Sequence, residues 1–308
     1  METLQITLFG HVSVVHPCAN GQLRLSRSTQ ALLAYLLLHR HLVPRDVLMD
    51  VFWVDHAPDR ARSSLTTALW RLRQLLEPDD TAPGAYLLVG SQGEVGFNWN
   101  SSHFLDTEAF EQHICPLLRK PLVELDDHDI GQIEQVLTLY RGELLEGMYE
   151  DWALRERERF RSLHLNCLTR LMECYASRRD YERSIALATE ILRRDPVREE
   201  IHRALMRLYL ESGQRTLAIR QYAACRDLLS QELGVLPLEE TMALHQQILA
   251  SSQADARRAA GQPGSQEIAQ LLERPPRATR RQHLSLHRPR VAGTERARRR
   301  AGGMARVC

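Results

Sequence analysis

The stretch PDRARSSLTTALWRLRQLL, residues 58–76, decides the fold of the first third of the chain. Its apolar residues recur with the 3.6-residue period of an α-helix and form one stripe that would face a core: Leu65, Ala68, Leu69, Leu72 and Leu76. Pro58 suits the first position of a helix, and Pro78 would stop it after Glu77. No acidic residue stands between Asp59 and Glu77. The stretch therefore predicts an amphipathic helix with a cationic solvent face.

The solvent face of this helix has the chemistry that reads a DNA major groove. Arg binds guanine O6 and N7 or a phosphate, Gln binds adenine, and Thr contacts the thymine methyl group. The residues expected on that face and its shoulders are Arg60, Arg62, Ser63, Ser64, Thr67, Trp70, Arg71 and Gln74. Two other interpretations stay open: a solvated amphipathic helix without a ligand, or a Trp70 that packs against a neighbouring hairpin and is structural.

The segment before this helix predicts strands and two more helices. Residues 4–15 alternate as a half-buried strand does, and Asn20-Gly21 predicts a turn into a returning strand at residues 22–25. Helical spacing then runs from Ser28, a candidate N-cap, to Arg40, and again from Pro44 to Trp53.

The segment after the helix predicts a hairpin. Residues 86–89 and 94–99 flank Gly90-Ser91-Gln92-Gly93, which is typical of a tight connection between two strands. The predicted order over about 100 residues is strands, three helices and a hairpin.

From Asp106 to Ala250 the pattern predicts helices throughout. The sequence compared with itself at an offset of 34 aligns residues of matching kind: Leu171 with Leu205, Met172 with Met206, Tyr175 with Tyr209 and Ile185 with Ile219. That period belongs to tetratricopeptide helix pairs, in which each helix buries its apolar stripe against the next.

Charge divides the chain into three parts. Residues 1–105 hold eight Arg or Lys against nine Asp or Glu, residues 106–250 hold 19 against 26, and residues 251–308 hold 13 against four. The net charges are therefore −1, −7 and +9. The last part lacks apolar periodicity and predicts a basic disordered tail. Such a tail either adds nonspecific attraction to nucleic acid or has no function, and the sequence leaves both open.

Composition and missing motifs exclude several classes of protein. Hydrophobic residues make up 44% of the 308 residues, and the longest apolar runs, such as residues 32–38, are far shorter than the ~20 residues of a membrane span. No basic-then-apolar leader opens the chain, and the six cysteines lack CxxC or zinc spacing, so we expect a cytoplasmic protein without a metal. GxxxxGK[ST], HExxH, GxSxG and a strand-linked GxGxxG are all absent, so we expect neither an enzyme nor a cofactor.

Several motifs together resemble a known family. In the first part they are LLAYL (32–36), DVFW (50–53), ARSSL (61–65) and LWRLR (69–73). In the second they are YRGELLEG (140–147), DWALRERE (151–158), REEIHRALM (198–206) and ELGVLP (232–237). Residues 1–105 resemble an OmpR-type winged helix. The whole of residues 4–250 is similar to the SARP class of bacterial regulators, which join that winged helix to a bacterial transcriptional activator domain.

The resemblance implies a transcriptional activator that binds direct repeats near promoters and recruits RNA polymerase. In OmpR-like winged helices the third helix enters the major groove, and the hairpin, called the wing, reaches the adjacent minor groove. Carried over by position, the DNA contacts would come from Arg60, Arg62, Ser63, Ser64, Thr67, Trp70, Arg71 and Gln74 on the helix, and from Ser91 and Gln92 on the wing. The wing departs from the family pattern, because no Arg or Lys stands between Gly84 and Asn100.

We therefore expect three parts: an OmpR-type winged-helix DNA-binding domain at 1–105, a tetratricopeptide-like bacterial transcriptional activator domain at 106–250, and a basic disordered tail at 251–308. The expected fold is an α+β winged helix-turn-helix followed by an all-α domain. The expected partners are double-stranded DNA and RNA polymerase, with a homodimer on DNA and no membrane. A tetratricopeptide interaction scaffold with a vestigial winged helix is the alternative, and an enzyme with an unrecognised site is a more distant one.

Overall fold

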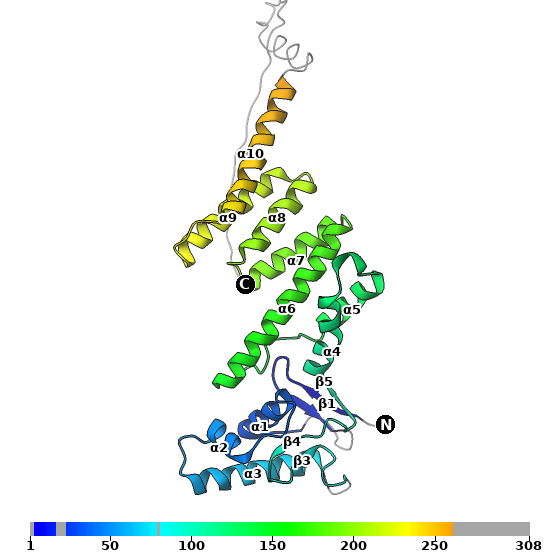
Figure 1. The fold of residues 1–308 in the computed structure, drawn as a ribbon, viewed down its shortest axis with the longest axis vertical. Coiled ribbons are helices and arrows are strands. Elements are labelled where there is room, and N and C mark those ends of the chain that lie inside the picture. Colours follow the sequence, from blue (N-terminus) through cyan, green and yellow to red (C-terminus); the bar gives the residue numbers. More distant parts are fainter. Residues whose placement is uncertain (1–2, 17–22, 79–80, 261–308) are drawn as a thin grey trace, which may run out of the picture. The chain divides into compact units, whose positions relative to one another are not determined.

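The first third of the chain holds a small sheet, three helices and a hairpin (Figure 1). The protein is described by a computed structural model at residues 3–16, 23–78 and 81–260. The elements in chain order are β1 (Leu4–Thr7), β2 (Ser13–Val15), α1 (Arg27–Leu38), α2 (Arg45–Phe52), α3 (Pro58–Leu76), β3 (Leu87–Val89), β4 (Val95–Phe97) and β5 (His103–Leu105). The predicted order is therefore confirmed, and β5 is a strand that the sequence patterns did not predict.

The sheet is built around β1. This strand pairs antiparallel with β2, where Ile6 lies opposite Val14, and parallel with β5, where Ile6 lies opposite Leu105. All three side chains are buried, so this face of the sheet is core. The parallel pairing of β1 with β5 places residues 103–105 beside the first strand of the chain.

The prediction of a single strand at residues 4–15 is wrong. The chain turns back at Gly10, whose φ of +83° lies in the left-handed region that favours glycine, and the returning strand begins at Ser13. Residues 4–15 are thus two strands, and residues 23–25 are not a strand, although Leu23 N–H donates to the Val14 carbonyl at 2.8 Å. The predicted turn at Asn20-Gly21 lies outside the described residues.

The three helices follow their predicted positions with one correction. The N-cap of α1 is Ser26, whose hydroxyl accepts from the Thr29 N–H at 3.4 Å, so Ser28 lies inside the helix. Pro44 directly precedes α2, and Pro58 occupies the first turn of α3, where its missing N–H has no cost.

The apolar stripe of α3 attaches the helix to the core. Leu65, Ala68, Leu72 and Leu76 are buried as predicted, and Leu69 is half-buried. The buried members join α1 and the strands in one hydrophobic cluster. Each buried leucine contributes about 1.5–3 kcal/mol relative to an exposed one, so the opposite face of α3 is held outward by packing.

The rest of the described chain is helical, as predicted (Figure 1). Its elements are α4 (Asp106–Arg119), a 3-10 turn (Leu122–Glu124), α5 (Asp127–Leu137), α6 (Asp151–Ser177), α7 (Tyr181–Arg194), α8 (Glu199–Glu211), α9 (Arg215–Glu232) and α10 (Glu239–Ala260). Helices α6 and α7 pack as one pair and α8 and α9 as the next, which is the tetratricopeptide-like arrangement. Residues that align at the sequence offset of 34 lie inside these packed pairs. Leu171, Leu205, Met172 and Met206 are all buried.

Two details of the helical part differ from the prediction. Residues 138–150 are not helical and form a loop, in which Leu144 makes an antiparallel bridge with Phe9. In addition, α10 runs to Ala260, so the expected disordered tail does not begin at residue 251. Residues 261–308 lie outside the described residues.

One buried carboxylate joins the two parts of the fold. Both oxygens of Asp106, the first residue of α4, accept from Leu8 N–H at 2.9 and 3.0 Å; Phe9 and Thr107 donate to it at 3.0 and 2.8 Å. In the same region Leu145 N–H donates to the Leu8 carbonyl at 2.9 Å. Residues 1–252 accordingly form one compact unit.

The described cysteines include two that lie in the core. Cys167 and Cys174 are buried and pack as small apolar side chains, and burial raises the pKa of both thiols. Within the described ranges, no three or more His, Cys, Asp or Glu residues are grouped to hold a metal ion. None of the helices described combines the length and apolar character needed to cross a bilayer.

Candidate nucleic-acid interface

The outward face of α3 is open to solvent. Of the eight residues predicted to bind DNA from this helix, Ser64 is half-buried and the others are exposed: Arg60, Arg62, Ser63, Thr67, Trp70, Arg71 and Gln74. Ser91 and Gln92 are exposed in the turn of the β3–β4 hairpin. The predicted separation of a buried stripe from an open face is therefore confirmed for the whole length of α3.

Three hydroxyls on this face are already donors. Ser63, Thr66 and Thr67 donate to the carbonyls four residues earlier, at 3.0, 2.8 and 2.9 Å. Each hydroxyl oxygen still has an acceptor lone pair. These side chains are thus fixed in direction before any ligand arrives.

The arginines of the face have no acidic partner. Arg60, Arg62 and Arg71 form neither a hydrogen bond nor an ion pair with any residue in the described ranges. An acid-free helix face leaves all three guanidinium groups available for an external anion. This face is therefore cationic although residues 1–105 as a whole have a net charge of −1.

The predicted residues gather in three pockets along α3. One, of about 330 Å³, is lined by Ser28, Trp53, Arg60, Ser63, Ser64, Thr67, Ala68 and Arg71. The second, of about 390 Å³, is lined by Pro44, Arg45, Asp46, Met49, Arg62, Leu65, Gln92 and Glu94. The third, of about 230 Å³, is lined by Arg45, Thr66, Leu69, Trp70, Arg73, Leu87, Val89 and Val95. Gln74 and Ser91 line none of these three.

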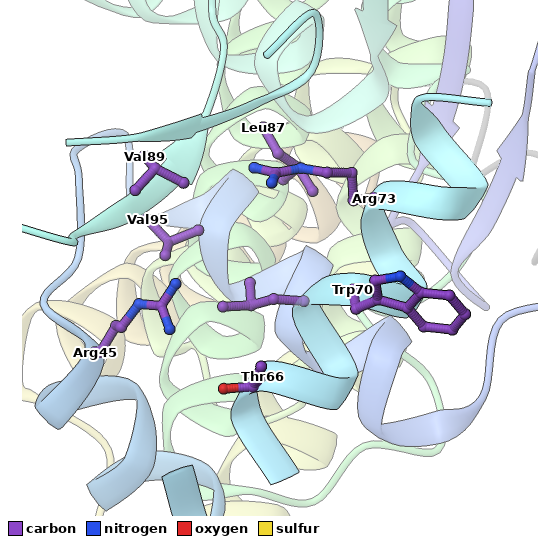
Figure 2. Close-up of a pocket in the computed structure, with 8 residues that line it drawn as sticks. Arg45, Thr66, Trp70, Arg73, Leu87, Val89 and Val95 are labelled. Carbon is purple, nitrogen blue, oxygen red and sulfur yellow. The ribbon is translucent and has the colours of Figure 1, made fainter. Parts of the chain in front are cut away.

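Trp70 is exposed rather than packed on the hairpin. Its side chain is 61% exposed, and Figure 2 shows the indole ring directed away from Val89 and Val95. The structural interpretation of Trp70 is therefore not supported. An exposed indole among cationic and hydroxyl groups offers a flat apolar surface to a ligand.

The hairpin beside α3 has the predicted turn. Leu87 lies opposite Phe97 and Val89 opposite Val95, and the chain reverses at residues 90–93. Gly93 has a φ of +86°, and Gly90 N–H donates to the Glu94 carbonyl at 2.8 Å. Glu94 also accepts from the Gln92 N–H at 3.1 Å. The turn therefore presents Ser91 and Gln92 on a fixed backbone.

Glu77, at the end of α3, anchors the hairpin to the helix. Its carboxylate is buried and accepts from Leu87 N–H at 2.8 Å, from Tyr86 N–H at 2.9 Å and from Gly84 N–H at 3.2 Å. Arg73 lies 3.4 Å from the same carboxylate. This arrangement fixes the distance between the face of α3 and the hairpin.

We expect Glu77→Gln to loosen the hairpin and to lower the free energy of unfolding by about 1–2 kcal/mol. The amide keeps one acceptor oxygen but directs an NH2 group toward a backbone N–H that the carboxylate now accepts. Urea denaturation and amide hydrogen exchange at Tyr86 and Leu87 measure the two effects. Glu94→Gln, which changes one bond in an open turn, is the matched control and should cost a few tenths of a kcal/mol. Unchanged exchange at both amides in Glu77→Gln would rule out the anchor.

Arg45, Thr66 and Arg73 line the same surface but were not among the predicted contacts. Arg45 lies on α2, far from α3 in sequence, and only the folded chain brings it to the hairpin. Thr66 and Arg73 stand on the shoulder of the helical pattern, where the periodicity alone does not decide between core and solvent.

Comparison with known proteins finds a domain match and related regulatory proteins. Residues 105–249 match the bacterial transcriptional activator domain. The chain is 28% identical to the regulatory protein AfsR of Streptomyces coelicolor over 271 residues, which cover 87% of this chain and 26% of AfsR. It is 26% identical to the transcriptional regulatory protein MoaR1 of Mycobacterium tuberculosis over 237 residues, which cover 71% of each chain. These similarities support a SARP-type transcriptional regulator.

A solved structure has a similar fold. Mycobacterium tuberculosis EmbR, in complex with a low affinity phosphopeptide, has a TM-score of 0.70 at 19% identity. The match covers 89% of this chain and 72% of that one, so it spans both the sheet-containing part and the helical part. The chain spans about a quarter of the length of the AfsR proteins that it matches.

Proposed function

We propose that this SARP-type regulator binds promoter DNA with sequence specificity through α3 and activates transcription there. In this proposal residues 1–105 are an OmpR-type winged-helix domain, with α3 as the recognition helix and the β3–β4 hairpin as the wing. Residues 106–250 are the activator domain that contacts RNA polymerase. Its site of action is then the bacterial cytoplasm, where the chromosome lies.

The observation that carries the proposal is the open, acid-free face of α3. Arg60, Arg62 and Arg71 have no acidic partner in the described part of the chain, and the stripe behind them is buried. A helix is the element that the major groove, about 12 Å wide, admits. The enzyme and scaffold alternatives give no reason for three unpartnered guanidinium groups on one helix face.

The side chains of this face divide into two kinds of contact. A guanidinium group binds guanine O6 and N7 with two hydrogen bonds or binds a phosphate, whereas Gln74 has the donor and acceptor pair that adenine requires. The methyl group of Thr67, which is exposed, suits a thymine methyl. The near-neutral charge of residues 1–105 favours specific contacts over general phosphate attraction, which a strongly basic domain would provide.

The resemblance to SARP-type regulators supports tandem binding. Two copies on a direct repeat would pair on DNA, with half-sites about 10.5 bp apart if both bind one face of the duplex. The stacked helix pairs α6–α7 and α8–α9 supply a surface for the second copy or for RNA polymerase.

Selection of bound duplexes from a random DNA pool by the full chain, at low and at moderate salt, tests the proposal. Enrichment of a direct repeat that survives moderate salt supports sequence-specific binding. Recovery of arbitrary sequences at low salt alone would leave phosphate attraction as the whole effect. The scaffold alternative would then be favoured.

We expect Arg71→Ala to weaken specific binding by about 1–3 kcal/mol and to relax base preference at one position of each half-site. The reason is the loss of a guanidinium group with no intramolecular partner in the described residues. Titration of the enriched duplex and of its single-base variants measures both effects. Arg119→Ala, at an exposed arginine of α4, is the charge-matched control and should bind as the unchanged chain does. Equal affinity and equal base preference in Arg71→Ala would remove Arg71 from the interface.

A further inference from the structure

We propose that Arg45, on α2, binds a DNA backbone phosphate beside the turn at residues 90–93. Arg45 would thus supply the positive charge that the hairpin itself lacks. The proposal rests on the proposed DNA-binding function and adds to it a contact that belongs to neither α3 nor the hairpin sequence. The hairpin has no cationic side chain of its own, because residues 85–99 contain no Arg or Lys.

Strand pairing brings Arg45 to the turn. Val43 and Val95 exchange both backbone hydrogen bonds, at 2.8 and 2.9 Å, so the segment before α2 lies along β4. Gly96 permits this approach, because a Cβ there would stand 2.9 Å from the Leu42 side chain and 3.3 Å from the His41 carbonyl oxygen. Arg45 follows two residues after this bridge, at the first position of α2.

The side chain of Arg45 is held at the turn by one of its five donors. Its Nε donates to the Gly93 carbonyl at 3.0 Å, which fixes the plane of the guanidinium group. Figure 2 shows this group directed from α2 toward the pocket between α3 and the hairpin. The bond to Gly93 leaves the two terminal nitrogens, which form no other hydrogen bond within the described residues.

The charge of Arg45 is not neutralised within the fold. No carboxylate of the described residues lies within 4 Å of it. Glu94 lines the same pocket but accepts from the Gln92 N–H at 3.1 Å, which engages it in the turn. Arg73, the other arginine near the hairpin, differs in this respect because it is paired with the buried Glu77.

The position of Arg45 identifies the occupant as the sugar-phosphate backbone. It lines both the pocket that holds Arg62 and Gln92 and the pocket that holds Thr66 and Trp70. A strand of DNA that leaves the α3 face for the hairpin must pass this point. A planar guanidinium with two free terminal nitrogens matches two phosphate oxygens.

The test measures the salt dependence of binding to the enriched duplex with the full chain. We expect Arg45→Ala to weaken binding about tenfold at 0.1 M salt, to a similar extent for the best site and for its single-base variants. The slope of log K against log salt concentration should become shallower by about 0.9, the contribution of one phosphate. Arg45→Lys should keep most of that slope, since it keeps the charge. Arg119→Ala should keep affinity and slope.

The possible results separate this inference from the proposed function. An unchanged slope in Arg45→Ala, with specific binding by the unchanged chain intact, overturns the Arg45 assignment and leaves the DNA-binding function standing. An equal slope loss in Arg45→Lys also overturns it, because the effect would then come from the Gly93 hydrogen bond and not from charge. If no duplex is enriched by the unchanged chain, the proposed function fails first.

Discussion

Asp106→Ala is expected to lower the free energy of unfolding by about 3–5 kcal/mol, the largest effect that we predict for a single polar side chain. The Asp106 carboxylate is 3% exposed and accepts from the backbone N–H groups of Leu8, Phe9 and Thr107. Its removal leaves buried donors without a partner, and each such donor costs about 1–3 kcal/mol. Urea denaturation at pH 7, monitored by circular dichroism, measures the loss.

The cost of burying the Asp106 charge reduces the stability that its hydrogen bonds contribute. Desolvation raises the pKa of Asp106 above its ordinary value, and the three backbone hydrogen bonds only partly oppose that rise. The ionised carboxylate therefore holds the turn after β1 to the start of α4 at some electrostatic cost. Asp106→Asn, which keeps one acceptor oxygen and removes the charge, should lose about half as much stability as Asp106→Ala.

Asp127→Ala is the matched control, because Asp127 also stands in the first turn of a helix. Its side chain is 92% exposed and pairs with Arg178 on the surface, so its loss should cost less than about 1 kcal/mol. If the free energy of unfolding of Asp106→Ala were within 1 kcal/mol of that of the unchanged chain, Asp106 would not be the residue that holds the two parts of the fold together. Should Asp106→Ala fail to fold at all, the Asn variant still measures the effect.

The sequence was sufficient where one periodic pattern determined one element. The stripe from Leu65 to Leu76 predicted the buried side of α3, and the Gly-rich stretch at 90–93 predicted the hairpin turn. It was insufficient where long-range pairing decides. The strand β5 has three residues and exists because β1 lies beside it, and the same holds for the bridge between Phe9 and Leu144.

The candidate site shows the same division. The predicted residues of α3 lie on its open side because a helix fixes the direction of each side chain. Arg45 was missed, because its position at the hairpin depends on the Val43–Val95 bridge, which no local pattern encodes. The helical pattern predicts Glu77 only as the end of the helix, whereas burial and three backbone N–H donors make it the anchor of the hairpin.

A buried histidine should make the fold sensitive to mild acid. His164, on α6, is 4% exposed, stacks on Tyr140 at 4.0 Å between ring centroids, and has no hydrogen-bond partner for either ring nitrogen among the described residues. Desolvation, aided by the positive charge of Arg194, lowers the pKa of His164 from 6.5 to about 4. The folded chain therefore resists a proton that the unfolded chain accepts.

The sign of the effect follows from this difference in pKa. Above pH 6.5 both states are neutral at His164 and its contribution to stability is complete. As the pH falls from 6.5 to about 4, the unfolded state binds a proton that the folded state does not, and stability declines by up to about 3 kcal/mol. The decline ends near pH 4, where the folded state also takes up the proton.

His164→Phe should abolish this decline, because phenylalanine keeps the stack on Tyr140 and cannot be protonated. Urea denaturation of both chains at intervals from pH 7 to pH 4 should give free energies of unfolding that diverge by about 3 kcal/mol toward pH 4. His56→Gln, at an exposed position, should follow the unchanged chain. Parallel profiles for His164→Phe and the unchanged chain would show that His164 takes up its proton in the folded state as readily as in the unfolded one.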